Sequence, residues 1–113
     1  MKECIFCRIV AGEIPAKMVH QDDEVVAFRD ASPKAPVHLL LVPRRHIASL
    51  DDVQPADAAL LGRLLIAAKE LAAGEGVGGA YRLVTNCGST AGQSVFHLHV
   101  HLLGGRPMGW PPG

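Results

Sequence analysis

The chain has 113 residues, of which 49% are hydrophobic, and its 11 basic and 11 acidic side chains give a formal net charge of zero. This length predicts one domain, residues 1–113, with enough apolar residues for a single core. Binding to nucleic acid or to an anionic membrane needs a basic excess, so the charge balance argues against both partners. No apolar run in the sequence approaches the roughly 20 residues that span a bilayer.

The first half of the sequence predicts one short helix and three strands. Residues 4–11 carry an apolar stripe at helical spacing. Residues 16–20 and 24–29 are typical of two short strands joined by a polar turn. Residues 37–42 form a nearly continuous apolar strand whose one polar member is His38.

The second half predicts one long helix and two further strands. In residues 55–73, leucine and alanine recur at the 3.6-residue period, and a proline occupies the first turn. Residues 81–86 and 95–103 are predicted as strands, separated by a loop at 87–94. A small antiparallel sheet packed on one long and one short helix, an α+β fold, is therefore expected.

Three histidines alternate with apolar residues in the last predicted strand. Side chains alternate between the two faces of a strand, so His97, His99 and His101 should share one face at spacings of roughly 6.5–7 Å. A polar strand face is ordinary, but three successive histidines are not needed for solvation. The opposite face is expected to enter the core and consists of Phe96, Leu98, Val100 and Leu102.

Neighbouring imidazoles suit two kinds of chemistry. An unperturbed histidine, with a pKa of about 6.5, is mostly neutral near pH 7, and close neighbours titrate as a coupled group. Two of them could bind zinc, or one could attack phosphorus as a neutral nucleophile. The loop at 88–94 supplies two glycines, three hydroxyls and an amide, which can face an anion. This loop favours the second chemistry.

Residues 4–113 resemble the histidine triad family, and most closely its nucleotide-binding branch. The family motif stands here as His-Leu-His-Val-His-Leu-Leu at 97–103, preceded by Gly-Gln-Ser-Val-Phe at 92–96. The resemblance includes the ending Gly-Gly-Arg at 104–106 and Trp-Pro-Pro-Gly at 110–113. It implies a single domain of the histidine triad fold, assembled as a homodimer whose sheet continues across the interface.

The resemblance implies a purine nucleoside phosphoramidase, which hydrolyses the P–N bond of adenosine 5′-phosphoramidates without a catalytic cofactor. His99 would be the nucleophile and form a nucleotidyl-histidine that water resolves. Ser94 would assist departure of the amine. His38 and His101 would orient or neutralise groups around His99, and His97 completes the catalytic set.

The resemblance also implies how a purine nucleotide is bound. Asp30 would bind the ribose hydroxyls, although it could be merely a turn residue before Ser32 and Pro33. Trp110 would approach the active site of the partner subunit and shape leaving-group preference. The phosphate and sugar would meet Asn86, Gly92, Gln93 and Ser94. The base pocket would consist of Phe6, Ile9, Phe28 and Leu40, which the sequence alone does not distinguish from core.

Other activities remain open at this point. Transferase relatives replace the third histidine with glutamine, so His101 favours water as the acceptor. Hydrolysis of dinucleoside polyphosphates or of adenylates is the main enzymatic alternative, although such relatives lack the Trp110 ending. A nucleotide-binding adaptor protein is the non-enzymatic alternative.

A Cys-x-x-Cys pair, Cys4 and Cys7, forms a second constellation. On a helix the two thiols face the same way and could make half of a zinc site, with His46 and His97 as the candidate partners. The alternative is two small buried residues on an amphipathic helix. Related proteins work without the pair, so such zinc would be structural. Three cysteines imply no disulfide framework, and no leader sequence is evident, so we expect a cytoplasmic protein.

Overall fold

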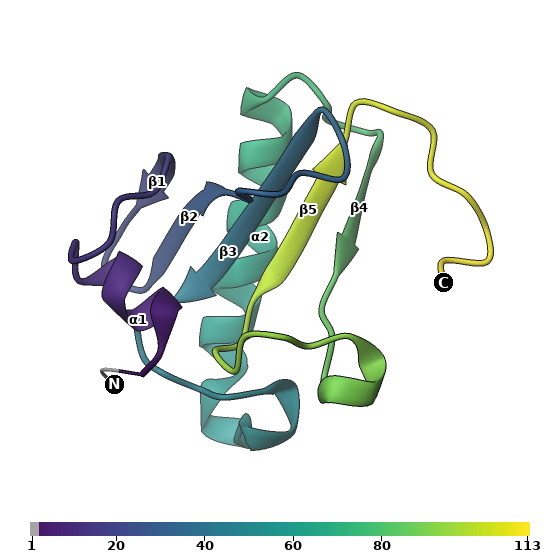
Figure 1. Cartoon of the computed structure of the whole chain (residues 1–113). Coiled ribbons are helices and arrows are strands. Elements are labelled where there is room, and N and C mark those ends of the chain that lie inside the picture. The colour runs from purple at the N-terminus through teal and green to yellow at the C-terminus, as the bar shows by residue number, and fades with distance from the viewer. Residues whose placement is uncertain (1–2) are drawn as a thin grey trace.

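Five antiparallel strands form one sheet in the order β1-β2-β3-β5-β4 (Figure 1). The computed structural model describes residues 3–113. The central strand is β3, and β1 and β4 form the two edges. The bounds are β1 Met18–Gln21, β2 Val25–Arg29, β3 Val37–Pro43, β4 Tyr81–Val84 and β5 Val100–Gly104.

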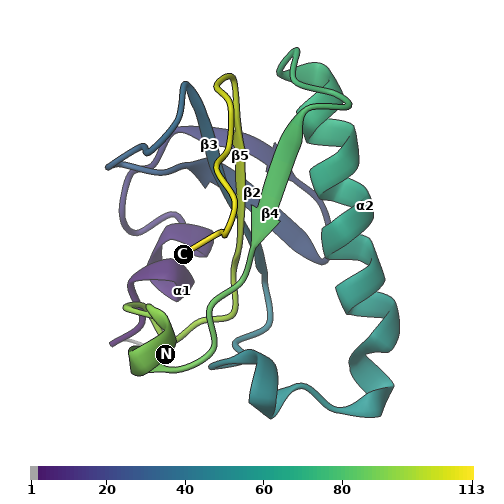
Figure 2. The same cartoon turned by 90° about the vertical axis from the view of Figure 1, so that its right-hand side faces the viewer.

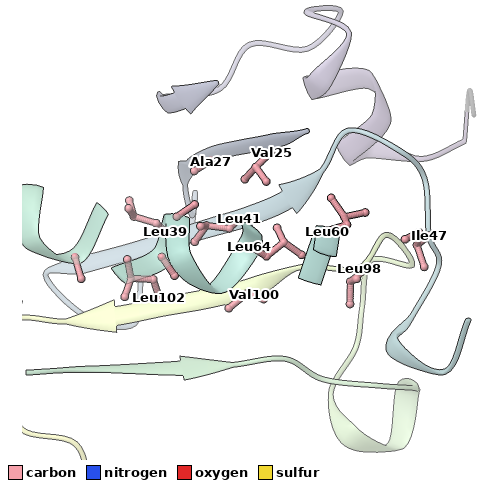
Figure 3. Packing of buried hydrophobic residues seen from close by; sticks show 13 residues of the cluster. Val25, Ala27, Leu39, Leu41, Ile47, Leu60, Leu64, Leu98, Val100 and Leu102 are labelled. Carbon is pink, nitrogen blue, oxygen red and sulfur yellow. The ribbon is translucent and has the colours of Figure 1, made fainter. Parts of the chain in front are cut away.

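Two helices, α1 (Ile5–Val10) and α2 (Ala58–Gly74), lie on opposite faces of this sheet (Figure 2). Under α2, side chains of three strands meet Leu64 and its neighbours in the larger apolar cluster (Figure 3). On the opposite face, Phe6 of α1 packs against Phe28 in a smaller cluster. The expected α+β fold, with an antiparallel sheet, one long helix and one short helix, is confirmed.

Strand β3 is buried on both faces, which explains its nearly continuous apolar sequence. Leu39 and Leu41 belong to the cluster under α2, whereas Leu40 and Val42 pack on the α1 side. His38 has the same parity as Leu40 and is buried. The alternation of β3 therefore places one imidazole on the face that α1 partly covers.

At the start of each helical segment, a side chain accepts a hydrogen bond from a backbone N–H. Cys4 is the N-cap of α1, and its Sγ accepts a hydrogen bond from the Cys7 backbone N at 3.3 Å. The predicted long helix starts as a 3-10 turn, Pro55–Asp57, before α2 continues it. Asp57 fixes that turn by accepting the Gln54 backbone N–H at 2.9 Å.

The last predicted strand is wrong in its first half. Strand β5 begins at Val100, and residues 95–99 form irregular chain. Leu98 N donates to Ile47 O at 2.6 Å, a contact with the loop after β3 rather than with a strand. Phe96, which was expected in the core, is 47% exposed, whereas the other three apolar residues of this stretch are buried.

After β5 the chain leaves the sheet and passes beside β4 (Figure 1). Gly104 permits a close approach to the turn after α2, since a Cβ there would lie 2.9 Å from Val77. Among residues 3–113 no helix combines the length and the apolar character needed to cross a membrane.

Candidate active site

His38, His99 and His101 meet on the sheet face that carries α1. His38 comes from β3 and His101 from β5, and their ring centroids lie 5.2 Å apart. The His99 ring lies 5.0 Å from that of His101 and 5.1 Å, edge to face, from Phe6 of α1. Residues 97–99 are not a strand, yet Phe6 packs against the rings of both His97 and His99, so these two rings lie on the side of α1.

The backbone fixes the protonation pattern of His99. Its Nδ1 lies 2.7 Å from the carbonyl oxygen of His97, an atom that accepts but never donates a hydrogen bond. Nδ1 therefore carries the proton in neutral His99, and Nε2 keeps an unshared electron pair. The ring is buried, so its orientation is held by packing as well as by this bond.

A second backbone contact fixes His38. The Lys34 backbone N–H donates to His38 Nδ1 at 3.0 Å, so the proton of neutral His38 lies on Nε2. That Nε2 is 2.9 Å from His101 Nδ1 and 3.4 Å from Asp30 Oδ2. His38 thus donates to His101, and the proton of neutral His101 then lies on its outer nitrogen, Nε2.

Burial keeps these rings neutral. Loss of solvation, together with the adjacent His99 and His38, lowers the pKa of His101 to about 4. Burial also lowers the pKa of His38, although the Asp30 carboxylate acts in the opposite direction. Near pH 7 His38 and His101 are therefore uncharged imidazoles with defined donors and acceptors.

The loop between β4 and β5 is organised by Gln93. Its buried side chain accepts the Gly88 N–H at 2.9 Å and donates to the carbonyl oxygens of Ala48 and Val95. The Gln93 backbone N–H also bonds to Gly88 O at 3.0 Å. Gln93 therefore holds the loop together, and the adjacent Ser94 is exposed.

Gly92 brings Asn86 against this loop. Its φ of +104° is a conformation that residues with a Cβ rarely adopt, and an added Cβ would lie 3.5 Å from Asn86 Nδ2. The predicted phosphate-binding residues Asn86, Gly92, Gln93 and Ser94 are thus parts of one compact turn, with Gln93 as its internal brace.

The four residues predicted to form a base pocket lie in one apolar cluster. Phe6 and Phe28 have ring centroids 5.4 Å apart with an interplanar angle of 74°, and Leu40 is buried beside them. Ile9 packs against the same cluster from α1. Asp30 stands near this region through its contact with His38, and its Oδ1 also accepts the Ser32 N–H at 2.8 Å. Asp30 is therefore both a turn residue and a neighbour of the histidines.

Trp110 is placed away from this cluster. It is 83% exposed, and the Arg82 guanidinium lies 5.9 Å from its ring centroid. Arg82 also donates to Gly109 O at 2.7 Å, so one side chain of β4 holds the end of the chain against the sheet edge.

Cys4, Cys7, His46 and His97 converge at the N-terminus of α1, with their ligand atoms within 4.8 Å of one another. Cys4 Sγ and Cys7 Sγ each lie 3.4 Å from His97 Nδ1. His46 Nδ1 lies 3.2 Å from Cys7 Sγ and 3.3 Å from His97 Nδ1. The two helix thiols and two histidines from separate loops thus form one donor set.

This donor set fits a tetrahedral metal ion. Zinc bonds of about 2.3 Å to sulfur and about 2.0–2.1 Å to nitrogen place sulfur about 3.5 Å from nitrogen, and two nitrogens about 3.3 Å apart. The distances between Cys4, Cys7, His46 and His97 match these edges. His97 Nε2 donates to Pro43 O at 2.8 Å, which leaves Nδ1 free to bind a cation.

The groups that orient the histidines were missed in the sequence. They are backbone atoms of Lys34, Pro43 and His97, and a backbone N–H or C=O leaves no signature in residue type. A side-chain contribution, that of Arg106 to the Lys34 carbonyl, was also missed. Its one signal was its place directly after the Gly-Gly pair at 104–105.

Comparison with known proteins agrees with this geometry. Residues 11–108 match the HIT domain family. An uncharacterised HIT-like protein from Synechocystis is 53% identical over 112 residues, which cover 99% of this chain and 98% of that protein. A HIT family hydrolase from Legionella pneumophila has 54% identity and a TM-score of 0.96, covering 98% of this chain and 100% of its own.

A more distant structure is the histidine triad nucleotide-binding protein from Candida albicans. It has 30% identity and a TM-score of 0.83, and the match covers 96% of this chain and 83% of that one. The fold and the histidine cluster define the class of protein to which the chain belongs. The chain is a member of the HIT domain family.

Proposed function

We propose that this protein hydrolyses purine nucleoside 5′-phosphoramidates at the P–N bond. The bond from His99 Nδ1 to the His97 carbonyl carries this proposal, because it places the proton of the neutral ring on Nδ1 and leaves the electron pair of Nε2 to attack phosphorus. His101, where transferase relatives have glutamine, supports water as the final acceptor. The HIT family hydrolases among the similar structures support hydrolysis as the reaction class.

The reaction divides into two displacements at phosphorus. In the first, His99 Nε2 forms a bond to phosphorus while the P–N bond breaks, and the amine leaves with a proton supplied in the site. Ser94 would hydrogen-bond to the departing nitrogen. In the second, water attacks the nucleotidyl-histidine, the bond to His99 breaks, and nucleoside monophosphate is released. The neutral pair His38–His101 would orient and relay protons around these steps.

Substrate contacts follow the positions of the predicted residues. The apolar cluster of Phe6, Ile9, Phe28 and Leu40 would take the base, and Asp30 the ribose hydroxyls. Backbone and side-chain groups around Asn86, Gly92 and Ser94 would face the phosphate, with Gln93 bracing the loop. The substrate is thus a purine nucleotide with an amine on its phosphate.

The cluster of Cys4, Cys7, His46 and His97 would hold a structural zinc ion. Its donor chemistry and spacing suit zinc, and the proposed nucleophile is not among the ligands. Zinc bound there would tie the N-terminus of α1 to the loop after β3 and to the chain before β5. It would stabilise the site without taking part in the chemistry.

We further propose a cytoplasmic, single-domain homodimer whose sheet continues through β4. That strand is an edge of the sheet, and α2 exposes Leu65 and Ile66. The exposed Trp110 supports a role across the interface, beside the partner's active site. No nucleic acid or membrane partner is expected from the charge balance.

A turnover comparison tests the activity. Purified protein should hydrolyse adenosine 5′-phosphoramidate with a higher kcat/KM than diadenosine polyphosphate or adenylylsulfate. Faster turnover of either alternative would replace the proposal with that sister activity. Tight nucleotide binding without turnover of any of the three would favour an adaptor protein.

A further inference from the structure

The turn after β5 packs tightly on the loop that enters β3. A Cβ at Gly105 would lie 2.9 Å from Pro36 Cβ, and the φ of +92° at Gly105 also disfavours a larger residue. The next residue, Arg106, donates from Nε to the Lys34 carbonyl oxygen at 2.9 Å. Two consecutive residues of the turn therefore hold the loop at 34–36.

Lys34 connects this contact to the histidines. Its backbone N–H donates to His38 Nδ1 at 3.0 Å, which leaves the proton of His38 on Nε2, 2.9 Å from His101 Nδ1. The Lys34 side chain turns back and donates to Ser32 O at 2.9 Å, so it acts on His38 through its charge and not through a hydrogen bond to the ring. The position of the Lys34 backbone, not its side chain, determines the tautomer of His38.

We propose that Arg106 is a positioning residue for His38, because its hydrogen bond to the Lys34 carbonyl holds the N–H that selects the Nε2-protonated tautomer. Without this bond the loop can withdraw that N–H, and His38 Nδ1 can take the proton. His101 Nδ1 would then have to donate to His38 Nε2. The direction of the hydrogen bond between the two rings would be reversed, and so would the nitrogen that His101 offers to its surroundings.

The Asp30 carboxylate limits the size of this effect. Its Oδ2 lies 3.4 Å from His38 Nε2 and also favours a proton there. Loss of the Arg106 contact should therefore give a mixture of tautomers rather than a complete reversal. The consequence for turnover rests on the proposed function, whereas the consequence for the tautomer does not.

The experiment records imidazole ¹⁵N spectra of the full chain at pH 7.5, where His38 is neutral. In the wild type, His38 Nε2 should carry the proton. Arg106→Met keeps the side-chain length without a donor and should produce a measurable Nδ1-protonated population. Arg106→Gln places an N–H as many bonds from Cα as Nε is, so it should retain the wild-type tautomer. Arg82→Met is the matched control, because it removes the hydrogen bond to the Gly109 carbonyl and keeps the one to the Lys34 carbonyl. It should leave the tautomer of His38 unchanged.

Turnover provides a second readout. Arg106→Met should lower kcat for adenosine 5′-phosphoramidate about 10-fold with little change in KM, the size typical for loss of a partner that orients a functional histidine. Arg106→Gln should restore most of it. If Arg106→Met does not fold, Arg106→Lys replaces it, since its donor lies one bond further out and should also mix the tautomers.

A wild-type His38 protonated on Nδ1 would overturn the inference, as would an unchanged tautomer in Arg106→Met. Equal tautomer mixtures in Arg106→Gln and Arg106→Met would also overturn it, because charge rather than the hydrogen bond would then matter. A tautomer change in a protein that hydrolyses no phosphoramidate would refute the proposed function and leave this inference intact.

Discussion

The chemistry of a histidine depends on which ring nitrogen holds the proton, and here backbone atoms decide it. His97, His99 and His38 each use one nitrogen on a carbonyl or an N–H of the chain. The other nitrogen is left free in His97, where metal binding is proposed, and in His99, where attack on phosphorus is proposed, whereas in His38 it donates to His101. Three histidines that lie close together in the fold thus present different ring nitrogens to their surroundings.

Replacement of the proposed nucleophile is the first test at this scale. His99→Asn should lower turnover of adenosine 5′-phosphoramidate by about 10³-fold or more, because no side chain remains to attack phosphorus. Nucleotide affinity, measured by calorimetry, should change little, since the base and ribose contacts remain. A rapid quench of the wild type should trap nucleotide on residue 99.

His20→Asn is the matched control, because His20 lies in β1 and pairs with Asp22 outside the site. It should turn over substrate at close to the wild-type rate. Near-normal turnover by His99→Asn, or trapped nucleotide at another residue, would contradict the assignment.

The lowered pKa of His101 predicts a pH dependence of stability. Between about pH 6.5, the value of an unfolded histidine, and about pH 4, its value in the fold, the unfolded chain binds more protons than the folded protein. The free energy of unfolding should therefore fall as pH falls through this window, with a contribution of at most about 1.4 kcal/mol per pH unit. Above that window the contribution of His101 is fully present.

Urea unfolding of wild type and His101→Gln at several pH values measures this contribution. The difference between the two proteins isolates His101 from other groups that titrate in the same range. The stability of the variant should depend less steeply on pH between 6.5 and 4. Parallel curves for the two proteins would show that His101 keeps an ordinary pKa.

At the scale of elements, α1 joins two parts of the site. With its N-cap, α1 contributes Cys4 and Cys7 to the cluster of Cys4, Cys7, His46 and His97. It also packs Phe6 against the ring of His99. A helix of six residues has little stability of its own, so its position depends on these contacts. A metal ion in the cluster would therefore act on the proposed base pocket through the same element.

Removal of one thiol tests the metal site. Purified wild-type protein should contain about one zinc ion per chain, and Cys7→Ser should lose it and melt at a lower temperature. Some turnover should persist, because His99 is not a ligand. Cys87→Ser is the control, since Cys87 lies outside the cluster. This variant should keep both its zinc and the melting temperature of the wild type. Wild-type protein free of zinc, with a melting temperature equal to that of Cys7→Ser, would rule out the site.

Residue patterns predicted most of the elements because the central strands and both helices bury apolar side chains. The α2 helix follows from its spacing of apolar residues, and strand β3 from its nearly continuous apolar run. Residues 95–99 misled the interpretation, because alternation of polar and apolar residues does not show whether a hydrogen-bonded partner strand is present. Leu98 bonds to Ile47 in a loop, a long-range contact that no local pattern encodes.

The site was predictable to the extent that side-chain chemistry identifies it. The two thiols and the histidines carry their function in their residue type, and the structure brings Cys4, Cys7, His46 and His97 together. The internal role of Gln93 was not predictable, because an amide in a glycine-rich loop can face either an anion or the loop itself.

At the scale of the whole molecule, the C-terminal segment after β5 leaves the sheet and lies beside the edge strand β4. Arg82 holds Gly109 and covers one face of Trp110, so the segment has a defined position although most of its residues are exposed. A large aromatic side chain left exposed is expected to gain a partner, and a second copy is the proposed one.

Deletion of residues 108–113 tests this role. The wild type should sediment as a dimer at micromolar concentration. The truncated enzyme should change its ranking of amine leaving groups more than its affinity for the bare nucleotide, because Trp110 is proposed to contact the leaving group. A monomeric wild type, or an unchanged ranking after truncation, would contradict the arrangement.

The closed packing around Phe6 has a consequence for motion. Phe6, Phe28 and Leu40 are almost completely covered, so a purine cannot slide between them while α1 stays in place. If this cluster takes the base, as proposed, α1 has to move away from the sheet to admit it, and a helix of less than two turns has few hydrogen bonds of its own to resist such a movement. Amide protons of α1 should exchange with solvent much faster than those of β3, and a bound nucleotide should slow them. The shorter of the two α-helices would then control the access of a nucleotide to the proposed base pocket.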